Sequence, residues 1–384
     1  MVGFAGIDDE ARAPPAPGSR RTVSARARRA WPRVALLFAG SLAAGLLVLE
    51  GVLRLFHPQL LLFDTSAVWE PAEGLGVRRR PLLDTRVNTG EREVRVRSDA
   101  ARHRVGAAGP RDGARRILAV GDSMVEALQV EHEQTMTALA GDALGRALGE
   151  AVDVVNAGLG GYEPSHYVMV VREELAAGPC DLAVVFVFLE NDVVERRTAR
   201  FPPSARLGDR GPAASADGFL RRRSHLYVFV RNLRELRRTR AGAPRRHLLT
   251  NAERAHAGDQ AWAATVGILA EAAEEARRRS VPVLFVLLPP RQYVDEEDLG
   301  RMLWAFGLQR ADVDPGQPAR LLAEGLRARG LDVFDASPAL EAAVRAGEPD
   351  LYGRVDRHLG PAGHRAVARA LVPVLAARLR GGRR

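Results

Sequence analysis

Five short apolar runs, each followed by a helix-length stretch, most constrain how the C-terminal part of this chain can fold. They begin at Ile117, Val152, Leu182, Val281 and Leu331. Their residues are mainly Val, Leu, Ile and Phe, without the polar alternation of a strand that has one wet face. Strands buried on both faces and alternating with helices predict a parallel sheet in a doubly wound α/β domain, which we expect over residues 115–384.

The helices between these runs are predicted from their lengths and apolar periodicity. The first follows Gly121 and extends to about Leu148. The next ones cover about 164–177 and 259–279. A closing helix begins at Pro361, where the missing N–H of proline costs nothing.

A long apolar segment, residues 34–56, precedes this domain. Its first part, Val34 to Leu49, carries no charge, and Glu50 and Arg54 are spaced so that they can pair on a helix. At ~1.5 Å per residue the segment reaches about 34 Å, enough to cross a bilayer. A cleaved signal peptide is disfavoured because no convincing small-residue cleavage site follows, and a buried amphipathic helix would need a polar face. We therefore expect an uncleaved transmembrane anchor.

The segments on either side of the anchor set its expected topology. Residues 1–33 are rich in Pro, Ala, Gly and Arg and are predicted to be a disordered cytoplasmic tail. Seven arginines in this tail place the N-terminus inside by the positive-inside rule. Residues after about 57 then lie outside, on the periplasmic or outer face of the cell membrane. Residues 57–114 are expected to be a connector with short strands.

Charge and cysteine content exclude several functional classes. The formal net charge is +9, and all 56 basic residues are arginine. Ten arginines and one acid fall in residues 221–246, and outside this segment and the tail the chain is slightly acidic. A nucleic-acid-binding protein usually has basic charge spread over its binding domain, so we expect no nucleic-acid partner. With Cys180 as the single cysteine, an intrachain disulfide, a Cys-based zinc site and an iron–sulfur cluster are excluded.

The arginine-rich stretch belongs to a predicted insertion at about 193–255. Within it, residues 224–238 place Leu226, Phe229 and Leu233 on one face of a helix. One interpretation is a helix packed on the domain with its arginines in water. The other is a cationic lid that grips an anionic substrate or lipid headgroups.

Chemically active side chains gather at the ends of the predicted strands, where open parallel sheets bind their ligands. Ser123 follows the first strand, in Gly-Asp-Ser. The second strand leads into a glycine-rich turn that ends at Gly161, and Asn191 follows the third. Asp356 and His358 stand just before the closing helix.

These residues are the parts of an acyl-transfer site. A serine hydroxyl is a weak nucleophile until a base takes its proton, and His358 is the candidate base for Ser123. Asp356 can orient the imidazole and stabilise its charged form. The oxyanion would be bound by the Ser123 N–H, the Gly161 N–H and the Asn191 side-chain amide.

This ordered set of motifs resembles the SGNH/GDSL hydrolase superfamily over roughly residues 115–378. The resemblance implies a flavodoxin-like sheet and the same roles for these residues, and the anchor is similar to that of membrane-tethered bacterial members. Two positions depart from the family pattern. Leu189 replaces a glycine two residues before Asn191, which could narrow the acyl pocket. Only Arg357 separates Asp356 from His358, where two residues are usual, so a Ser–His dyad stays an alternative.

Other polar residues near these motifs have simpler interpretations. His364 is expected to cap or pack in the closing helix. Tyr162 and His166 either line the pocket or pack at a helix start. Glu190 and Asp192 have no histidine partners at metal spacing, so we expect neither a metal nor a cofactor.

The sequence thus predicts a membrane-anchored, extracytoplasmic serine esterase that acts through an acyl-enzyme on an acylated glycan or a lipid-like ester. An O-acyltransferase would use the same site, because only the second nucleophile differs. A non-catalytic protein that binds envelope glycan or a partner is the alternative from another class, although binding does not require a serine paired with a base.

Overall fold

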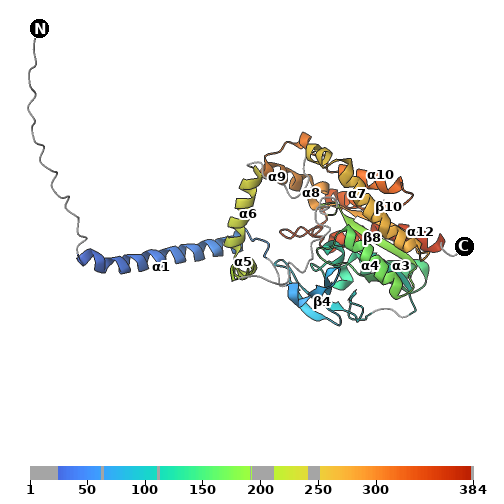
Figure 1. The fold of residues 1–384 in the computed structure, drawn as a ribbon, viewed down its shortest axis with the longest axis horizontal. Coiled ribbons are helices and arrows are strands. Elements are labelled where there is room, and N and C mark those ends of the chain that lie inside the picture. Colours follow the sequence, from blue (N-terminus) through green and yellow to red (C-terminus); the bar gives the residue numbers. More distant parts are fainter. Residues whose placement is uncertain are drawn as a thin grey trace, which may run out of the picture. The chain divides into compact units, whose positions relative to one another are not determined.

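The computed structural model describes residues 25–61, 65–109, 113–190, 192, 212–240 and 251–381. Figure 1 follows the elements along the chain. The predicted disordered tail lies outside the described residues up to residue 24. From Ala25 onward the tail belongs to a helix.

Helix α1 (Ala25–Phe56) contains the predicted anchor but begins nine residues before it. Pro32 lies inside the helix. The stretch Pro32–Phe56 is 25 residues long and, by length and composition, could cross a membrane. The chain divides into two compact units at this helix, Met1–Val52 and Leu53–Arg384. The second unit carries all the predicted site residues.

The second unit alternates strands with helices. Its strands are β1 (Trp69–Ala72), β2 (Gly76–Arg79), β3 (Asp84–Asn88), β4 (Glu93–Ser98), β5 (Arg104–Val105), β6 (Arg115–Val120), β7 (Val152–Asn156), β8 (Leu182–Phe188), β9 (Val283–Leu288) and β10 (Asp332–Asp335). Its helices are α2 (Ser123–Glu126), α3 (Met136–Leu148), α4 (Pro164–Ala177), α5 (Pro212–Arg223), α6 (His225–Arg240), α7 (Asn251–Arg277), α8 (Arg291–Val294), α9 (Glu296–Phe306), α10 (Gln317–Arg327), α11 (Ser337–Arg345) and α12 (Pro361–Gly381). Short 3-10 turns lie at Thr65–Ala67, His132–Gln134 and Arg310–Asp312.

The main sheet has the strand order β10-β9-β8-β6-β7-β5-β4-β3. Strands β6 to β10 pair in parallel, and β6 is the switch point between β7 and β8, which is the flavodoxin-like order. The doubly wound parallel sheet is therefore confirmed. The sheet as a whole is mixed, because β5, β4 and β3 add to it antiparallel.

The three added strands come from the segment predicted as a connector. In β4, Val94 and Val96 are buried while Glu93 and Arg95 are exposed. This alternation is typical of an antiparallel strand with one wet face. The valines pack with Leu128 in a small core of their own. Residues 57–114 thus contribute part of the main sheet as well as the separate β1–β2 hairpin.

The central parallel strands β6, β8 and β9 are buried on both faces over most of their length, as their apolar character predicts, whereas the edge strand β10 is only partly buried. Along β6, Leu118 and Val120 enter one core, which α4, α7 and α10 complete. Ile117 and Ala119 enter the opposite core, which α3, α11 and α12 complete. Each strand alternates between the two cores because successive side chains of a strand point to opposite faces.

The predicted arginine-rich insertion is described in part. Residues 193–211 and 241–250 lie outside the described residues. Between them, helices α5 and α6 pack against each other, and α6 also contacts α9. The expected helix over 224–238 corresponds to α6.

Candidate active site

Ser123 stands at the carboxyl end of β6, as predicted. Asp122 caps helix α2, its Oδ1 accepting the Met124 N–H at 2.9 Å. The predicted continuous helix to Leu148 is wrong. Helix α2 ends after one turn at Ala127, which has a φ of 56°. Helix α3 starts anew at Met136, so the intervening loop can reach the added strands.

The three residues predicted for catalysis come together in the structure. His358 Nε2 lies 2.8 Å from Ser123 Oγ, although 235 residues separate them in sequence. The other ring nitrogen, Nδ1, is hydrogen-bonded to Asp356 Oδ1. The carboxylate reaches the imidazole across the shortened spacing, so the geometry is that of a triad and not of a Ser–His dyad.

The backbone conformation of Arg357 allows Asp356 and His358 to contact each other across this short spacing. Its φ is 36°, in the left-handed region, which turns the flanking Asp356 and His358 side chains toward one another. The Arg357 guanidinium pairs with Asp298 on α9. Glu91, in the β3–β4 turn, accepts the Arg354 N–H at 2.8 Å and also the N–H groups of the next two residues, including Asp356. The loop is therefore held from both sides.

The environment of His358 suits a base. Burial favours the neutral ring, but the hydrogen bond to Asp356 and the charge of that carboxylate outweigh it, so the pKa of His358 is raised above its ordinary value. The Asp356 side chain is 6% exposed and that of His358 is 29% exposed. The His358 ring is therefore accessible from outside while the Asp356 carboxylate is shielded from water.

The glycine-rich turn after β7 lies against the start of α2. Asn156 holds it, its Nδ2 donating to the Val125 carbonyl at 2.7 Å and its Oδ1 accepting the Gly158 N–H at 3.2 Å. A Cβ on Gly158 would come within 2.5 Å of the Val125 side chain, so only glycine allows this approach. Gly161 has a φ of 85°, which glycine adopts without strain.

The third predicted oxyanion donor, Asn191, lies outside the described residues. Its neighbour Asp192 and the preceding Leu189 are described. Asp192 is buried, and its Oδ2 accepts the Tyr167 hydroxyl at 2.9 Å and the Phe188 N–H at 2.8 Å. Burial raises the pKa of Asp192 well above its ordinary value. Leu189, expected to narrow the pocket, is 3% exposed and packs in the core beside α4 and α7.

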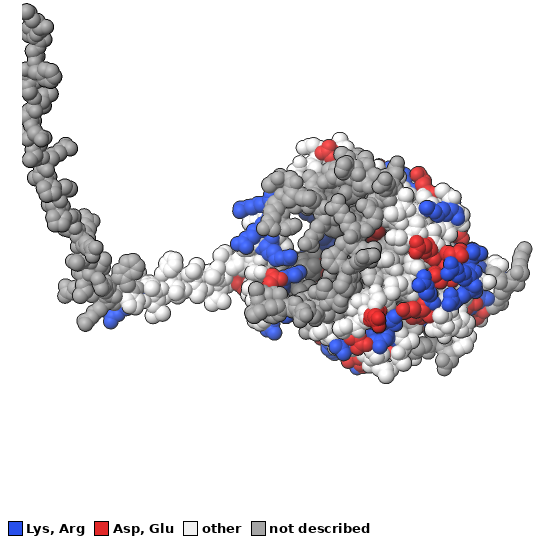
Figure 2. All heavy atoms as spheres, in the orientation of Figure 1, with Lys and Arg blue, Asp and Glu red and all other residues white. Residues whose placement is uncertain are grey.

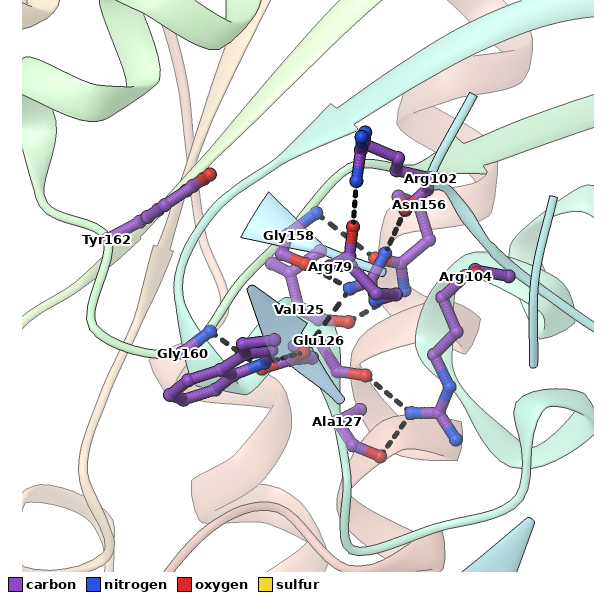
Figure 3. A network of polar contacts seen from close by, with 12 residues as sticks. Arg79, Arg102, Arg104, Val125, Glu126, Ala127, Asn156, Gly158, Gly160 and Tyr162 are labelled. Carbon is purple, nitrogen blue, oxygen red and sulfur yellow. Dashed lines mark hydrogen bonds and ion pairs between the residues drawn. The ribbon is translucent and has the colours of Figure 1, made fainter. Parts of the chain in front are cut away.

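A buried carboxylate that the sequence does not single out joins the Gly-Asp-Ser turn to the glycine-rich turn (Figure 3). Glu126, three residues after the nucleophile candidate, is 1% exposed. Its Oε2 accepts the Gly160 N–H at 2.7 Å, and its Oε1 accepts the Trp69 indole N–H at 2.8 Å. Arg79 supplies the opposite charge, 3.5 Å from Oε1.

Two buried arginines brace the same turns through backbone carbonyls (Figure 3). Arg79 donates to the Gly158 carbonyl, and Arg104 donates to those of Glu126 and Ala127. Both are at most 2% exposed. The Gly-Asp-Ser motif could have drawn attention to Glu126 by proximity. Nothing in the sequence sets these two arginines apart from the other basic residues.

The neighbouring aromatic residues have packing and capping roles. His364 is 1% exposed, its Nδ1 accepts the Met136 N–H at the start of α3, and burial lowers its pKa to about 3. This confirms the capping interpretation. His166 accepts the Glu163 N–H and stacks on Tyr162, with ring centroids 5.1 Å apart.

The acidic residue before Asn191 takes part in a structural contact. Glu190 accepts a hydrogen bond from Gln292 on α8 at 3.1 Å. Among the described residues, no three His, Cys, Asp or Glu side chains form a group that could hold a metal ion.

A comparison with known protein families finds one match. Residues 244–383, which include Asp356 and His358, match the family described as "SGNH hydrolase-like domain, acetyltransferase AlgX". No curated protein sequence matches this chain.

Solved structures resemble this chain at low identity. A lipolytic protein of the G-D-S-L family from Veillonella parvula is 12% identical, with 68% of this chain and 98% of that chain covered and a TM-score of 0.37. A catalytic mutant of an acetylxylan esterase from Geobacillus stearothermophilus is 14% identical, with 70% and 94% covered and a TM-score of 0.39. Similarity at this level assigns no activity.

The family match covers the half of the domain that carries the predicted base and its orienting acid. The strand order and the Gly-Asp-Ser turn supply the features expected of the other half. The chain therefore has an SGNH hydrolase-like fold, and its residues 244–383 match the SGNH hydrolase-like family.

Proposed function

We propose that this protein is a membrane-anchored serine enzyme that transfers acyl groups from esters through an acyl-enzyme. The observation that carries the proposal is the chain of contacts from Ser123 Oγ through His358 to Asp356. A binding protein has no need of a serine hydrogen-bonded to a histidine whose pKa is raised by a buried carboxylate.

In the proposed reaction Ser123 Oγ attacks the ester carbonyl carbon while His358 Nε2 takes the hydroxyl proton. The tetrahedral intermediate collapses, and His358 returns that proton to the departing alcohol. The acyl group is left on Ser123. A second hydroxyl, from water or from an acceptor alcohol, then attacks the acyl-enzyme by the same steps and frees the serine.

The oxyanion of each intermediate needs donors that are already in position. We assign this role to the Ser123 N–H, the Gly161 N–H and the Asn191 side chain. The left-handed backbone of Gly161 and the hydrogen bond that fixes the neighbouring Gly160 support the second assignment. Loss of one such donor typically costs about 3 kcal/mol of transition-state stabilisation.

For the substrate we propose an acylated glycan or a lipid-like ester on the extracytoplasmic side of the membrane. The apolar stretch Pro32–Phe56 and the arginines before it support this location. The family description names an acetyltransferase, which favours a short acyl group and gives the O-acyltransferase activity specific support beside hydrolysis.

The activity is tested with p-nitrophenyl acetate and longer-chain esters on the detergent-solubilised chain. We expect the short ester to be cleaved fastest and Ser123→Ala to abolish turnover. Ser337→Ala, on α11, is the matched control and should keep full activity. Equal turnover by wild type and Ser123→Ala would refute the proposal. An added glycan acceptor that gains the acyl group would identify transfer over hydrolysis.

The location is tested independently with a reporter fused to the C-terminus. A reporter that is active only outside the cytoplasm should be active in this fusion. If instead a reporter that works only in the cytoplasm is active in this fusion, the proposed topology is wrong, and the proposed chemistry is unaffected.

A further inference from the structure

Helices α5 and α6 form a pair with unusual charge. Residues 212–240 contain eight arginines and only two acids, Asp217 and Glu235. We call these residues the arginine-rich helix pair. None of its residues has a part in the proposed chemistry, and its charge calls for an anionic partner.

The arginine-rich helix pair contacts the last turn of the apolar span and the residues that follow it. Arg54 Nη2 donates to the Arg223 carbonyl at 2.6 Å. The Gln59 N–H donates to His225 Nδ1 at 2.8 Å. The ring of His57 meets that of Phe229 edge to face, with centroids 5.9 Å apart. The junction between α5 and α6 therefore lies within hydrogen-bonding distance of the end of α1.

These contacts fix the depth of the pair if the span is inserted. Pro32–Phe56 would measure about 37 Å as a helix, somewhat more than a hydrocarbon layer of about 30 Å. Arg54, near its end, then lies at headgroup level, where arginine is stable. The Arg223 carbonyl and the His225 ring, which hydrogen-bond Arg54 and Gln59, must therefore lie at or next to the same level.

The outward side of the pair has the composition of a membrane-surface helix. Arg223, Arg231, Arg234 and Arg237 are exposed, and Figure 2 shows basic side chains gathered over α5 and α6. Large apolar side chains are exposed beside them: Phe219 at 57%, Leu220 at 37% and Val230 at 37%. On the inward side Val228 is 5% exposed. Basic and apolar groups together match an interface of phosphate headgroups above acyl chains.

From these observations we infer that the arginine-rich helix pair binds the anionic headgroups of the membrane in which the chain is anchored. The inference rests on the proposed anchor. Phosphate oxygens would accept hydrogen bonds from the arginines, and the exposed Phe219, Leu220 and Val230 would enter the upper acyl region. The pair would hold the hydrolase-like domain against the bilayer.

The test uses the full chain reconstituted in phosphatidylcholine vesicles with or without phosphatidylglycerol. Val230→Cys, in a Cys180→Ser background, carries an environment-sensitive fluorophore. We expect a blue shift and quenching by lipid-borne spin labels when phosphatidylglycerol is present, and loss of both at high salt. A label at Arg345→Cys on α11, where the arginine side chain is 71% exposed, should not respond.

Charge variants decide whether the arginines cause the response. A triple change of Arg231, Arg234 and Arg237 to Gln should abolish it, and glutamine keeps the helix propensity. The matched control changes Arg277, Arg320 and Arg345 to Gln, all exposed elsewhere on the domain, and should leave the response intact. A response that is unchanged by the first triple variant, or by omission of phosphatidylglycerol, would overturn the inference.

Two further outcomes separate this inference from the proposals it follows. Flotation of the chain with carbonate-washed vesicles reports the anchor by itself. A chain that does not float refutes the anchor and this inference together, whereas a floating chain with a silent label refutes this inference alone. A response to soluble dextran sulfate but not to phosphatidylglycerol would assign the pair to a soluble polyanion instead.

Discussion

At the residue scale, Asp356 and His358 show how a short motif can be completed by backbone conformation. With one residue between them, an extended chain would send the two side chains in the same direction without turning them toward each other. Arg357 adopts a φ of 36° and closes the turn. The spacing could be read from the sequence. Its consequence could not, because it depends on contacts to Glu91 and Asp298, which are remote in sequence.

The role of Asp356 predicts a change in pH dependence. His358 must be neutral to accept a proton, so activity should rise with pH around an apparent pKa above the ordinary 6.5 of histidine. Asp356→Asn removes the charge that raises this pKa. We expect kcat to fall by roughly 10⁴-fold and the midpoint of kcat/KM to move to lower pH. A full pH–rate profile of both proteins measures this, and an unmoved midpoint would contradict the assigned role.

The backbone role of Arg357 can be separated from that of its side chain. Arg357→Gly and Arg357→Val both lose the contact with Asp298, but only glycine adopts a positive φ without strain. The glycine variant should keep most of the activity. The valine variant should lose it, because a β-branched residue disfavours this conformation. Steady-state rates compare the two, and equal losses would mean that the guanidinium matters and the backbone does not.

At the scale of elements, the parallel half of the fold is the part that the sequence predicts well. Its central strands β6, β8 and β9 are buried on both faces over most of their length, so their apolar runs identify them in the sequence. The antiparallel strands β3 to β5 are short and rich in arginine, and their pairing with β7 involves a single pair of residues. Short strands of this kind form because they pair with strands elsewhere in the chain, and no local sequence pattern identifies those partners. The bracing by Arg79 and Arg104 was missed for the same reason.

Glu126 is expected to act as a positioning residue that links two elements. In Glu126→Gln the amide would turn an N–H toward either Gly160 or Trp69, both of which donate to the carboxylate now. We expect kcat to fall by roughly 10- to 100-fold with little change in KM. The change would shift the glycine-rich turn, so the proposed oxyanion donor, the Gly161 N–H, would be displaced but not removed. The control Trp69→Phe loses one hydrogen bond and keeps the acceptor for Gly160, so its kcat should fall much less. Similar kcat values for both variants would argue against positioning.

His103 joins the added strands to α4 and predicts a pH-dependent stability. Burial disfavours its charged ring, but hydrogen bonds to Asp99 and Glu174 outweigh this and raise the pKa of His103 to about 9. Because the folded pKa is raised, the stabilisation is complete below about pH 6.5 and is lost as the pH rises through 9. Its upper limit is on the order of 3 kcal/mol.

Urea unfolding of the detergent-solubilised chain at pH 6 and pH 9.5 measures this contribution. Wild type should lose more unfolding free energy over that interval than His103→Gln, whose side chain does not titrate. The same pH dependence in both proteins would mean that His103 is not charged in the folded state.

At the scale of the whole molecule, the candidate site is assembled from segments that are far apart in the chain. The Gly-Asp-Ser turn, the glycine-rich turn and the Asp–His loop could each be predicted from the sequence, since each follows a strand or precedes a helix. Their mutual placement follows from the flavodoxin-like strand order. Several of the supporting groups, Trp69, Arg79, Glu91 and Arg104, come from residues 57–114, where no motif identifies them. The membrane anchor was predicted from length and hydropathy, and it is the contacts at its end that give the arginine-rich helix pair its proposed role.

The central claim is that Ser123 becomes acylated, and covalent labelling tests it most directly. The intact chain is treated with a fluorophosphonate, and peptide mass spectrometry locates the adduct. We predict one adduct, on Ser123, which forms much more slowly in His358→Ala and is absent in Ser123→Ala. A folded wild type that carries no adduct, or an adduct on another residue, would contradict the account.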